Sequence, residues 1–398
     1  MANALSGVRV LDLTHYVAGP YCTKLLADYG ADVIKVEKPG LGDPARSIGP
    51  FFHDTPGLEK SGLFLFLNTS KKSINLNLKS KDGAQILKQL VKDVDIVVEN
   101  FHPRVLPALG LDYEALKDCN PSLVMTSITN FGQSGPYKNY TMDAIVADGM
   151  GGWSITVGEP ERPPLKIGGY QAEFTAGLQA AMATMTALTY QELHGPGQHV
   201  DVSILESVVN MLMSDTILYA YTGQVKIREG VRHRPYPSTV LPCRDGYVGV
   251  IGHMPIQWET LCAWMEKPEL MDDPRFGTSG LRREHADDLD EILTSWLADK
   301  TQDELYHVAQ ELRIPFGKVM NAEQILHHTQ LIHRNYFMSI DHPATGEVKY
   351  PGAPFRFKDL PYDIQRAPLL GEHNEEIYGR RLGYRPEEVV RLRELGVI

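Results

Sequence analysis

The chain has 398 residues, more than one ordinary hydrophobic core accommodates, and this length predicts two domains. Its composition, 43% hydrophobic and 22% charged, is typical of a globular protein. The formal net charge is −11 and no block of basic residues is present, so we expect no nucleic-acid partner. No apolar run reaches the roughly 18 residues of a transmembrane helix, so we expect no membrane partner either.

Cysteine and histidine usage predicts neither disulfides nor a metal centre. The cysteines lie far apart and form no C-x-x-C pair, which favours reduced thiols in a cytoplasmic protein. The first residues lack the basic and apolar pattern of a secretion signal, which also favours the cytoplasm. His327, His328 and His333 have no Cys or acidic partner set nearby, so we expect no metal there. The cysteines are Cys22, Cys119, Cys243 and Cys262.

Residues 8–38 form a complete strand–turn–helix–strand pattern. The apolar run 8–13 predicts a largely buried strand, 21–28 has helical spacing that Gly30 stops, and 33–36 is a β-branched second strand. A helix that starts directly after a first strand is where α/β proteins tend to bind phosphorylated ligands. The segment lacks G-x-G-x-x-G, so a dinucleotide is not favoured.

The alternation of strands and helices continues through the first half of the chain. An amphipathic helix is predicted at 82–92, after the first two strands. Short buried strands are predicted at 95–99 and 123–128, after this helix. A long helix rich in Ala and Met, 174–193, is apolar on most sides and is expected to be central. Residues 202–221 predict a second long apolar helix. This order favours a parallel sheet with helices on both faces.

The character of the sequence changes after this helix. Residues 223–242, rich in Arg, Pro and His, are expected to connect two domains, and 245–251 predict a turn and a strand. Helices over 257–312 would complete a smaller domain, and 314–319 are expected to return toward the first. The C-terminal part is Pro-rich and predicts an extended arm with a final helix at 386–395.

The opening unit and a series of further motifs, in the same order, resemble the family III CoA-transferases, or CaiB/BaiF family. This family includes formyl-CoA and carnitine CoA-transferases, α-methylacyl-CoA racemases and two-subunit benzylsuccinate-type CoA-transferases. A resemblance that extends through ordered motifs to the last residue is specific. The motifs occupy 8–38, 40–46, 68–74, 98–101, 132–137, 197–202 and 367–373, and the chain closes with Leu-Arg-x-x-Gly-Val-Ile.

The resemblance implies an architecture that the spacing alone does not show. Residues 1–222 and 325–398 would form a large Rossmann-like, CoA-binding domain, and 223–324 a small α+β domain with its linkers. Two chains would thread through each other as interlocked rings. The dimer would be either a homodimer or a heterodimer with a paralogous subunit.

The resemblance also implies a catalytic residue. In the family an Asp at the start of the central helix is the nucleophile, and the aligned carboxylate here is Glu173, one methylene longer. The implied reaction moves CoA between carboxylic acids: the carboxylate attacks an acyl-CoA, with succinyl-CoA one candidate donor, and forms a mixed anhydride. Released CoA then gives an enzyme thioester, from which an acceptor acid takes the CoA. No cofactor beyond CoA as a substrate is expected.

The position of this carboxylate is critical for such chemistry. A carboxylate of pKa about 4 that displaces a thiolate of pKa about 8.5 works uphill by roughly 4 units, or about 6 kcal/mol. Oxyanion donors and binding energy from the distant nucleotide must offset this difference. A displacement of about 1 Å costs roughly 100-fold in rate, and an extra methylene moves the carboxylate by about that much.

Several interpretations of Glu173 therefore stay open. Glu173 is the working nucleophile in a locally adjusted loop, or the chain is a catalytically silent, CoA-binding subunit whose paralogous partner carries the Asp. A third interpretation is a plain N-terminal helix charge, favourable with the helix dipole. A racemase is disfavoured, because the family racemases use a His where this chain has Met142, and Met cannot transfer a proton.

The resemblance assigns CoA contacts position by position. Two other basic features stay open: Arg104 could replace a family Arg at the position of Ala108, and 232–237 are either a basic linker or a contact to a substrate carboxylate in the other subunit's site. Tyr140 stands where some transferases have a basic residue. The sequence does not identify the acids exchanged. The implied CoA-binding residues are Tyr16, Val17, Lys38, Leu76, Lys79, Asn100, Phe101, Arg104, Tyr140 and Ile204.

Overall fold

The structure is a computed structural model that describes residues 3–398, and the chain divides into two compact units. The first unit runs from the N-terminal residues to Trp153 and adds Ile167–Met213 and His333–Ile398. The second unit contains Ser154–Lys166 and Ser214–Ile332. Each unit has its own hydrophobic core, as expected for a chain of this length.

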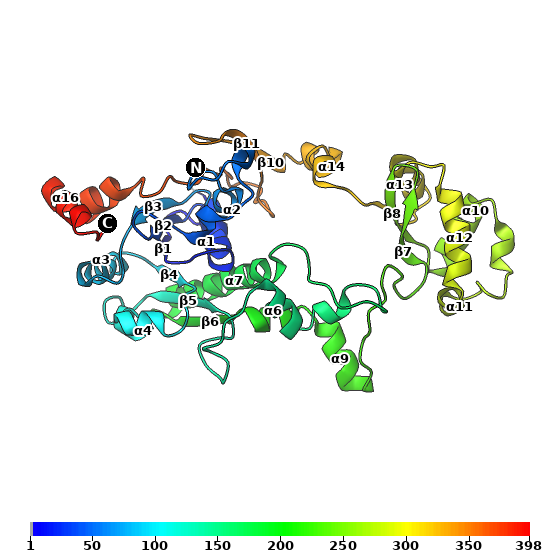
Figure 1. Cartoon of the computed structure of the whole chain (residues 1–398), viewed down its shortest axis with the longest axis horizontal. Coiled ribbons are helices and arrows are strands. Elements are labelled where there is room, and N and C mark those ends of the chain that lie inside the picture. Colours follow the sequence, from blue (N-terminus) through cyan, green and yellow to red (C-terminus); the bar gives the residue numbers. More distant parts are fainter. Residues whose placement is uncertain (1–2) are drawn as a thin grey trace. The chain divides into compact units, whose positions relative to one another are not determined.

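The first unit is built around one six-stranded parallel sheet, so the predicted α/β fold class is confirmed (Figure 1). The strand order is β3-β2-β1-β4-β5-β6, which is typical of Rossmann-type sheets. The chain proceeds outward from β1 to β3 and then returns to the other side of β1. The strands are β1 (Arg9–Asp12), β2 (Asp32–Glu37), β3 (Lys72–Asn75), β4 (Ile96–Glu99), β5 (Val124–Thr129) and β6 (His199–Ser203).

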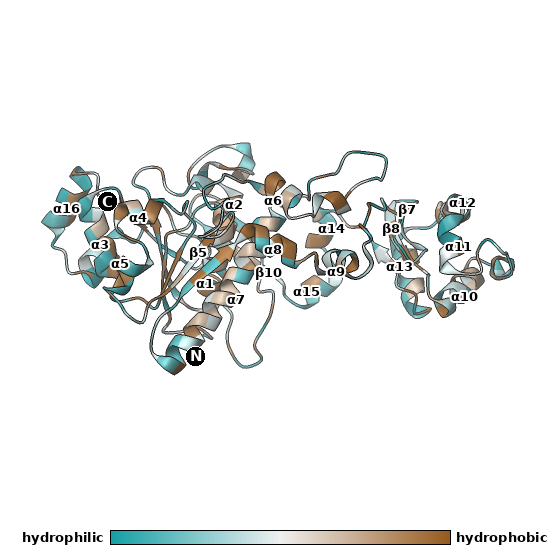
Figure 2. Cartoon of the chain, turned by 90° about the horizontal axis from the view of Figure 1, so that it is seen from below, coloured by the Kyte–Doolittle hydropathy of each residue, from teal (hydrophilic) through white to brown (hydrophobic). Residues whose placement is uncertain are grey.

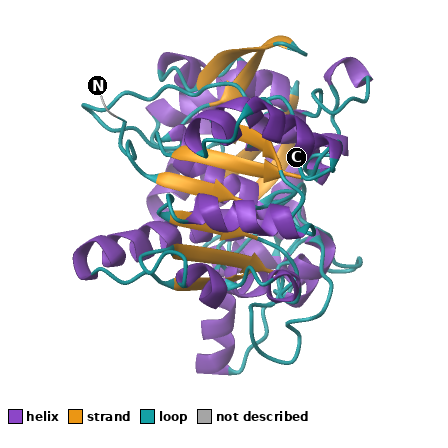
Figure 3. Ribbon diagram, turned by 90° about the vertical axis from the view of Figure 1, so that its left-hand side faces the viewer, coloured by secondary structure: helices purple, strands orange, loops and turns teal. Residues whose placement is uncertain are grey.

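Helices cover both faces of this sheet (Figure 3), and the strands are therefore apolar on both sides. In β1, Val10 packs on the face that carries α1 (Ala18–Asp28) and α7 (Gln171–His194). The next residue, Leu11, packs on the opposite face against α3 (Lys81–Val91). Two hydrophobic layers thus hold the sheet between them.

The remaining elements of the first unit are short. Two of them were not expected from the sequence: an antiparallel hairpin and a π-helical turn, both in the C-terminal part that predicted an extended arm. The elements are α2 (Gly62–Leu67), α4 (Val105–Leu109), α5 (Tyr113–Lys117), α6 (Ala144–Met150), α8 (Ile204–Asn210), the hairpin β10 (Phe337–His342) and β11 (Gly346–Pro351), the π-helical turn Glu375–Arg381 and α16 (Pro386–Glu394).

The predicted single helix over 202–221 is wrong. Val202 belongs to β6, and Ser203 caps α8 because its hydroxyl accepts a hydrogen bond from the backbone N–H of Glu206. α8 ends at Asn210, and α9 (Met213–Thr222) begins after a short break. The apolar composition of the segment was correctly recognised, but composition alone does not distinguish a buried strand end from a helix.

The second unit combines a three-stranded sheet with a helical layer. Residues 314–319 do not return to the first unit as predicted: β9 (Gly317–Lys318) pairs with β8, and Phe316 is buried in the core of the second unit. The units change at 213/214 and 332/333, where the predicted domain limits are 222/223 and 324/325, and residues 154–166 also belong to the second unit. The predicted domain limits stay a prediction. The elements are β7 (Ser238–Cys243), β8 (Gly246–Ile251), β9, α10 (Pro255–Trp264), α11 (Ser279–Glu284), α12 (Ala286–Leu297), α13 (Gln302–Glu311), α14 (Ala322–Leu326) and α15 (Thr329–His333).

The long helix α7 is buried on one side only. Small side chains such as Ala176 and Ala180 pack on the sheet layer, whereas Leu178, Met182 and Leu193 are 53%, 67% and 73% exposed. Hydrophobic colouring continues along α8 and parts of α6 in Figure 2. No helix within residues 3–398 is both long and apolar enough to cross a membrane.

Candidate active site

The candidate site lies at the carboxyl edge of the parallel sheet. Neighbouring strands β1 and β4 are followed by connections that leave in opposite directions, which makes a topological switch point. Ligands of open α/β sheets bind outside the strand ends at such a point. Most of the residues assigned to CoA binding follow a strand at this edge, so the fold brings these parts of the chain to one side of the first unit.

The β1–α1 loop, residues 14–16, has an unusual backbone conformation. Tyr16 has a φ of 65°, in the left-handed region that a bulky residue rarely adopts, and its side chain is 53% exposed. The following residue, Val17, is buried where α1 begins. Gly19 lies so close to the loop that a Cβ there would stand 2.3 Å from the Cβ of Thr14. The loop thus presents the Tyr16 ring to solvent from a tightly packed base.

Asn100 fastens this loop to the end of β4. Its side-chain oxygen accepts from the backbone N–H of His15 at 2.8 Å, and its amide group donates to the His15 carbonyl at 2.8 Å. Phe101 packs edge-to-face on the His15 ring with centroids 5.2 Å apart. Because both ends of the Asn100 amide are engaged, this side chain orients the β1–α1 loop across the switch point.

Glu173 occupies the first turn of α7, and the structure sets this turn beside the start of α1. Phe174 packs edge-to-face on Tyr21 of α1, with centroids 4.9 Å apart. One turn further, a Cβ on Gly177 would stand 2.5 Å from the carbonyl oxygen of Ala18, so only glycine fits there. Both helices point their N-termini at the carboxyl edge, and Oε2 of Glu173 is buried there. The carboxylate therefore belongs to a helix turn that packs on the start of α1, the helix that follows the loop assigned to CoA.

The basic residues assigned to CoA lie on the surface of the first unit. Lys38 directly follows β2, and Lys79 follows β3; both are exposed. Arg104 is also exposed, and its Nε donates to the side-chain oxygen of Asn139 at 3.0 Å. These three cations are accessible to the phosphate groups of a ligand.

The remaining assigned residues differ in exposure. Leu76 is buried in the hydrophobic core beneath β3, so its side chain is not available at the surface. Tyr140 is exposed and stacks on Tyr137, with ring centroids 4.9 Å apart. Ile204 opens α8 and packs, together with Met142, against a small apolar cluster that contains Ala172. Met142 and Ile204 thus lie near the residue before Glu173.

Arg232, in the basic segment 232–237, is engaged within the second unit. Its Nε lies 2.6 Å from the Asp290 carboxylate and its NH2 group 2.7 Å from Asp287. The Tyr236 hydroxyl also donates to Asp290. Arg232 therefore has two carboxylate partners of its own.

A buried charge network beneath the site was missed in the sequence analysis. Asp12 at the end of β1 lies 3.0 Å from the Nζ atom of Lys71 and 3.9 Å from that of Lys35, and all three side chains are fully buried. Burial works to raise the pKa of Asp12, but the two positive charges outweigh it and hold that pKa well below its usual range. Burial lowers the pKa of Lys71 to about 8. The sequence contained one signal for this network: each of two apolar strands carries a charged residue, Asp12 in β1 and Lys35 in β2.

Glu99, the last residue of β4, is a second buried carboxyl group. Its Oε2 accepts from the backbone N–H of Phe101 at 2.8 Å. Burial raises the pKa of Glu99 to about 7, although hydrogen bonds from Ser127 and Phe101 oppose this. The carboxyl group therefore titrates near neutral pH while it supports the turn that carries Asn100.

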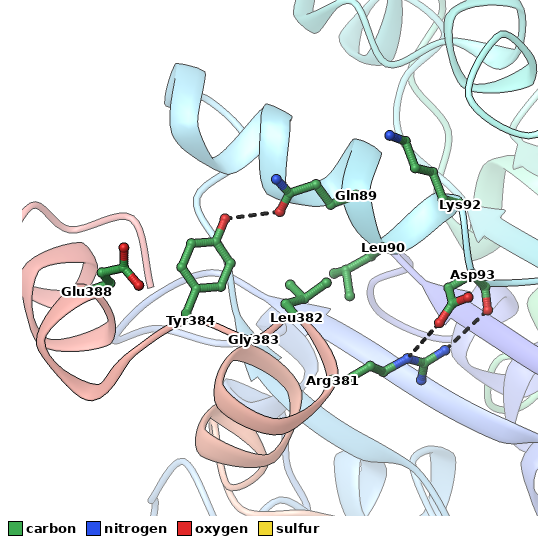
Figure 4. A pocket seen from close by; sticks show the side chains of 9 residues that line it. All are labelled: Gln89, Leu90, Lys92, Asp93, Arg381, Leu382, Gly383, Tyr384 and Glu388. Carbon is green, nitrogen blue, oxygen red and sulfur yellow. Dashed lines mark hydrogen bonds and ion pairs between the residues drawn. The ribbon is translucent and has the colours of Figure 1, made fainter.

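The first unit also has a cavity of about 510 Å³ that none of these residues lines (Figure 4). It lies between the end of α3 and the C-terminal segment, where the Tyr384 hydroxyl donates to the Gln89 oxygen at 3.0 Å. Asp93, which also lines it, precedes β4 and thus marks the amino edge of the sheet. None of the assigned CoA-binding residues lines this cavity, so it is not part of the candidate site.

Fold and site together define a class of protein: a Rossmann-type α/β protein with a carboxylate at a helix N-terminus on the ligand-binding edge. A family model described as "CoA-transferase family III" matches residues 5–374. The chain is 36% identical to the succinyl-CoA–D-citramalate CoA-transferase of Chloroflexus aurantiacus, over 99% of this chain and 98% of that protein. It is 33% identical to the formyl-CoA:oxalate CoA-transferase of Streptomyces avermitilis, over 100% of each chain.

A solved structure agrees with these relatives. A CaiB/BaiF family protein from Brucella suis superimposes with a TM-score of 0.87 at 32% identity, covering 96% of this chain and 100% of that one. The chain therefore belongs to CoA-transferase family III. It is a CoA-transferase or a subunit of one, and the resemblance stated from the sequence is confirmed.

Proposed function

We propose that this chain moves CoA between two carboxylic acids, with Glu173 as the nucleophile. The observation that supports the proposal is the close packing of the starts of α7 and α1, since Glu173 lies in the first turn of α7 and the β1–α1 loop leads into α1. Gly177 permits this approach, and a helix start provides backbone N–H groups and a favourable dipole for developing negative charge. Because the Glu173 side chain is one methylene longer than the Asp of the family, its carboxylate depends on such a pre-formed environment to be held in place.

The proposed reaction proceeds by ping-pong exchange. A Glu173 oxygen attacks the thioester carbonyl, the C–S bond breaks, and CoA thiolate leaves a mixed anhydride between Glu173 and the acyl group. The thiolate then attacks the Glu173 carbonyl, and the donor acid leaves as its carboxylate. The acceptor carboxylate attacks the enzyme thioester, and the returning thiolate attacks the acceptor carbonyl of the second anhydride, which restores Glu173.

CoA would lie along the carboxyl edge of the sheet. Tyr16, Val17 and Phe101 are proposed to line the pantetheine arm. The exposed cations Lys38, Lys79 and Arg104 are proposed to meet the phosphates, which Arg and Lys bind well. Tyr140 and Ile204 would complete the site, and Leu76, being buried, would contribute only its backbone.

The acids exchanged are proposed to be short and dicarboxylic, with succinyl-CoA as a donor. The relatives named for succinyl-CoA and citramalate and for oxalate support this class, although formyl-CoA carries a monocarboxylic acid. No metal, flavin or nicotinamide takes part in the proposed steps.

A second chain is proposed to cover the exposed apolar side of the first unit. Leu178 and Met182 of α7, Ile145 and Met150 of α6 and Val209 of α8 are all largely exposed hydrophobic residues. This surface favours an oligomer, either a homodimer or a heterodimer with a paralogue. We propose a cytoplasmic location from the reduced thiols that the sequence favours.

The alternative function is a catalytically silent, CoA-binding subunit whose partner carries an Asp nucleophile. The extra methylene of Glu173 favours this alternative, since it displaces the carboxylate by about 1 Å. A racemase remains the least supported function, because Met142 packs in an apolar cluster with Ala147 and Val208 and cannot transfer a proton.

The deciding experiment is peptide mass spectrometry after the purified chain is incubated with succinyl-CoA and reduced with borohydride. A CoA thioester on the nucleophile is reduced to an alcohol, so reduction of Glu173 supports the proposal. The variant Glu173→Gln serves as the control and should show no modification. CoA binding with an unmodified Glu173 across several acyl donors would contradict the proposal and favour the silent subunit.

A further inference from the structure

The backbone of the β1–α1 loop is held by the side chain of Asp12, directly before it, and by side chains distant in the sequence. Its first residue donates its N–H to Asp12 Oδ1 at 2.9 Å, and its carbonyl accepts from Lys35 Nζ at 2.9 Å. Its second residue is held at both N–H and carbonyl by Asn100. Because these backbone groups of the loop are hydrogen-bonded to side chains, the loop depends on those side chains for its shape.

Asp43 holds the third residue of the loop. The backbone N–H of Tyr16 donates to Asp43 Oδ1 at 3.1 Å, at the residue with the left-handed φ of 65°. A left-handed conformation at a bulky residue costs about 1–3 kcal/mol and persists only where its surroundings enforce it. The same oxygen accepts from the N–H of Ala45 at 2.8 Å, which ties the loop to the 3-10 turn Pro44–Ser47.

Lys35 and Asp43 form an ion pair directly beneath this loop. The Lys35 Nζ and Asp43 Oδ2 atoms are 2.8 Å apart, and both side chains are 0% exposed. Burying two charges is expensive, and such a pair often gives no more stability than apolar residues of similar size. The pair nevertheless supplies one donor and one acceptor to the loop backbone, which apolar residues cannot do. Its position therefore indicates a role in shaping the loop.

A second buried ion pair in the first unit provides a contrast. Lys24 Nζ lies 2.5 Å from Asp28 Oδ2 within α1, and the two side chains are almost fully buried. Their further partner is the Thr69 hydroxyl. The hydrogen bonds of this pair do not reach the β1–α1 loop. It is thus matched to Lys35–Asp43 in chemistry and burial but differs in what it holds.

We propose that Lys35 and Asp43 are positioning residues that hold the β1–α1 loop, and with it Tyr16, in the conformation that binds CoA. This inference rests on the proposed function for the identity of the ligand. Neither side chain touches CoA; both act through the backbone of residues 14–16. The strained loop is thereby pre-formed, so that less free energy is lost in ordering it when the ligand binds.

The test compares two double variants of the full chain. Lys35→Met/Asp43→Asn removes both charges but keeps an oxygen that can accept from Tyr16. Lys24→Met/Asp28→Asn is the matched control. Calorimetric titration with CoA should show a dissociation constant about tenfold higher for the first variant, the effect of about one lost charge-assisted hydrogen bond. The control should stay within about twofold of the parent.

Hydrogen exchange separates this inference from the proposed function. Amides of residues 14–17 should exchange faster than in the parent in Lys35→Met/Asp43→Asn but not in the control, whether or not CoA is present. Unchanged exchange, or unchanged CoA affinity in a folded variant, overturns the inference. If the parent binds no CoA, the proposed function fails, and loop exchange still decides whether the pair shapes the loop. Should the double variant not fold, Lys35→Arg, which keeps the buried positive charge but changes the geometry of the hydrogen bond to the loop carbonyl, is expected to show both effects in weaker form.

Discussion

The two units of the chain keep their charges in different places. The first unit buries Asp12, Lys35 and Asp43 beneath the carboxyl edge of its sheet, each with several partners. The second unit has an apolar core, and ion pairs such as Arg275–Asp273 lie at its surface. In the first unit, Lys35 and Asp43 hold the non-regular backbone at the edge where the ligand is proposed to bind.

Arg282 extends the same rule into the second unit. It is buried, and its guanidinium group donates to the carbonyls of Tyr236, Phe276 and His253. Its contacts are with backbone oxygens of connecting segments. Like Lys35 and Asp43, Arg282 is thus a buried charge that bonds the backbone of connecting segments.

The largest expected effect on stability tests the buried network directly. Asp12→Asn removes the carboxylate shared by Lys35 and Lys71, which leaves buried positive charge uncompensated. We expect the free energy of unfolding, measured in urea, to fall by about 3–5 kcal/mol. Asp273→Asn, at the surface of the second unit, should leave it unchanged. Equal losses in the two variants would remove the contrast between the units.

Glu99 sharpens the contrast through its pH dependence. Because its pKa of about 7 in the folded protein exceeds the ordinary 4.5, the folded state holds an extra proton between these values. The free energy of unfolding should therefore fall as the pH rises from about 4.5 to 7. Glu99→Gln should abolish this fall and be more stable than the parent by about 3 kcal/mol above pH 7. Thermal unfolding at pH 5 and pH 8 provides the measurement.

The control for this pH series is Glu192→Gln, at an exposed position of α7. It should follow the curve of the parent protein. If Glu99→Gln is less stable than the parent protein at pH 8, the carboxylate at this position is ionised and structurally required, contrary to the expectation.

Gly177 tests the packing that places Glu173. Gly177→Ala would put a Cβ 2.5 Å from the Ala18 carbonyl oxygen and force α7 away from α1. We expect a loss of about 1–3 kcal/mol in stability, and a fall in turnover of about 100-fold as Glu173 is displaced. Gly277→Ala in the second unit, where a Cβ meets no atom within 4 Å, is the control and should change neither. Unchanged turnover in a stable Gly177→Ala variant would separate the helix contact from catalysis.

The smallest expected effect concerns the strain of Tyr16. Tyr16→Gly relieves the left-handed φ, worth about 1–2 kcal/mol, but adds chain entropy of about 0.5–1 kcal/mol to the unfolded state. Stability should therefore change by about 1 kcal/mol or less, while CoA binding weakens through loss of the ring. His53→Gly, at another exposed left-handed residue, should behave alike in stability but leave CoA binding unchanged. Equal CoA affinity in both variants would exclude Tyr16 from the ligand contacts.

Much of the first unit was predictable from local patterns. The buried strands near 8–13, 33–36, 95–99 and 123–128 and the final helix at 386–395 appear at their expected places, because apolar runs bounded by turn residues are local signals. The hairpin formed by β10 and β11 was missed, and 314–319 were assigned to the wrong unit. Strand pairing joins residues distant in sequence, so no local pattern reports it.

The sequence by itself determined the α/β class, the family and the identity of the carboxylate at the start of α7. Only the tertiary structure decided that the first turn of α7 packs on the start of α1, that Asn100 is engaged by His15, and that Leu76 is buried. It also decided that Lys35 and Asp43, eight residues apart in the chain, meet beneath Tyr16. The physical reason is that class and motifs depend on residue type and spacing, whereas partners of a buried charge depend on which strands become neighbours.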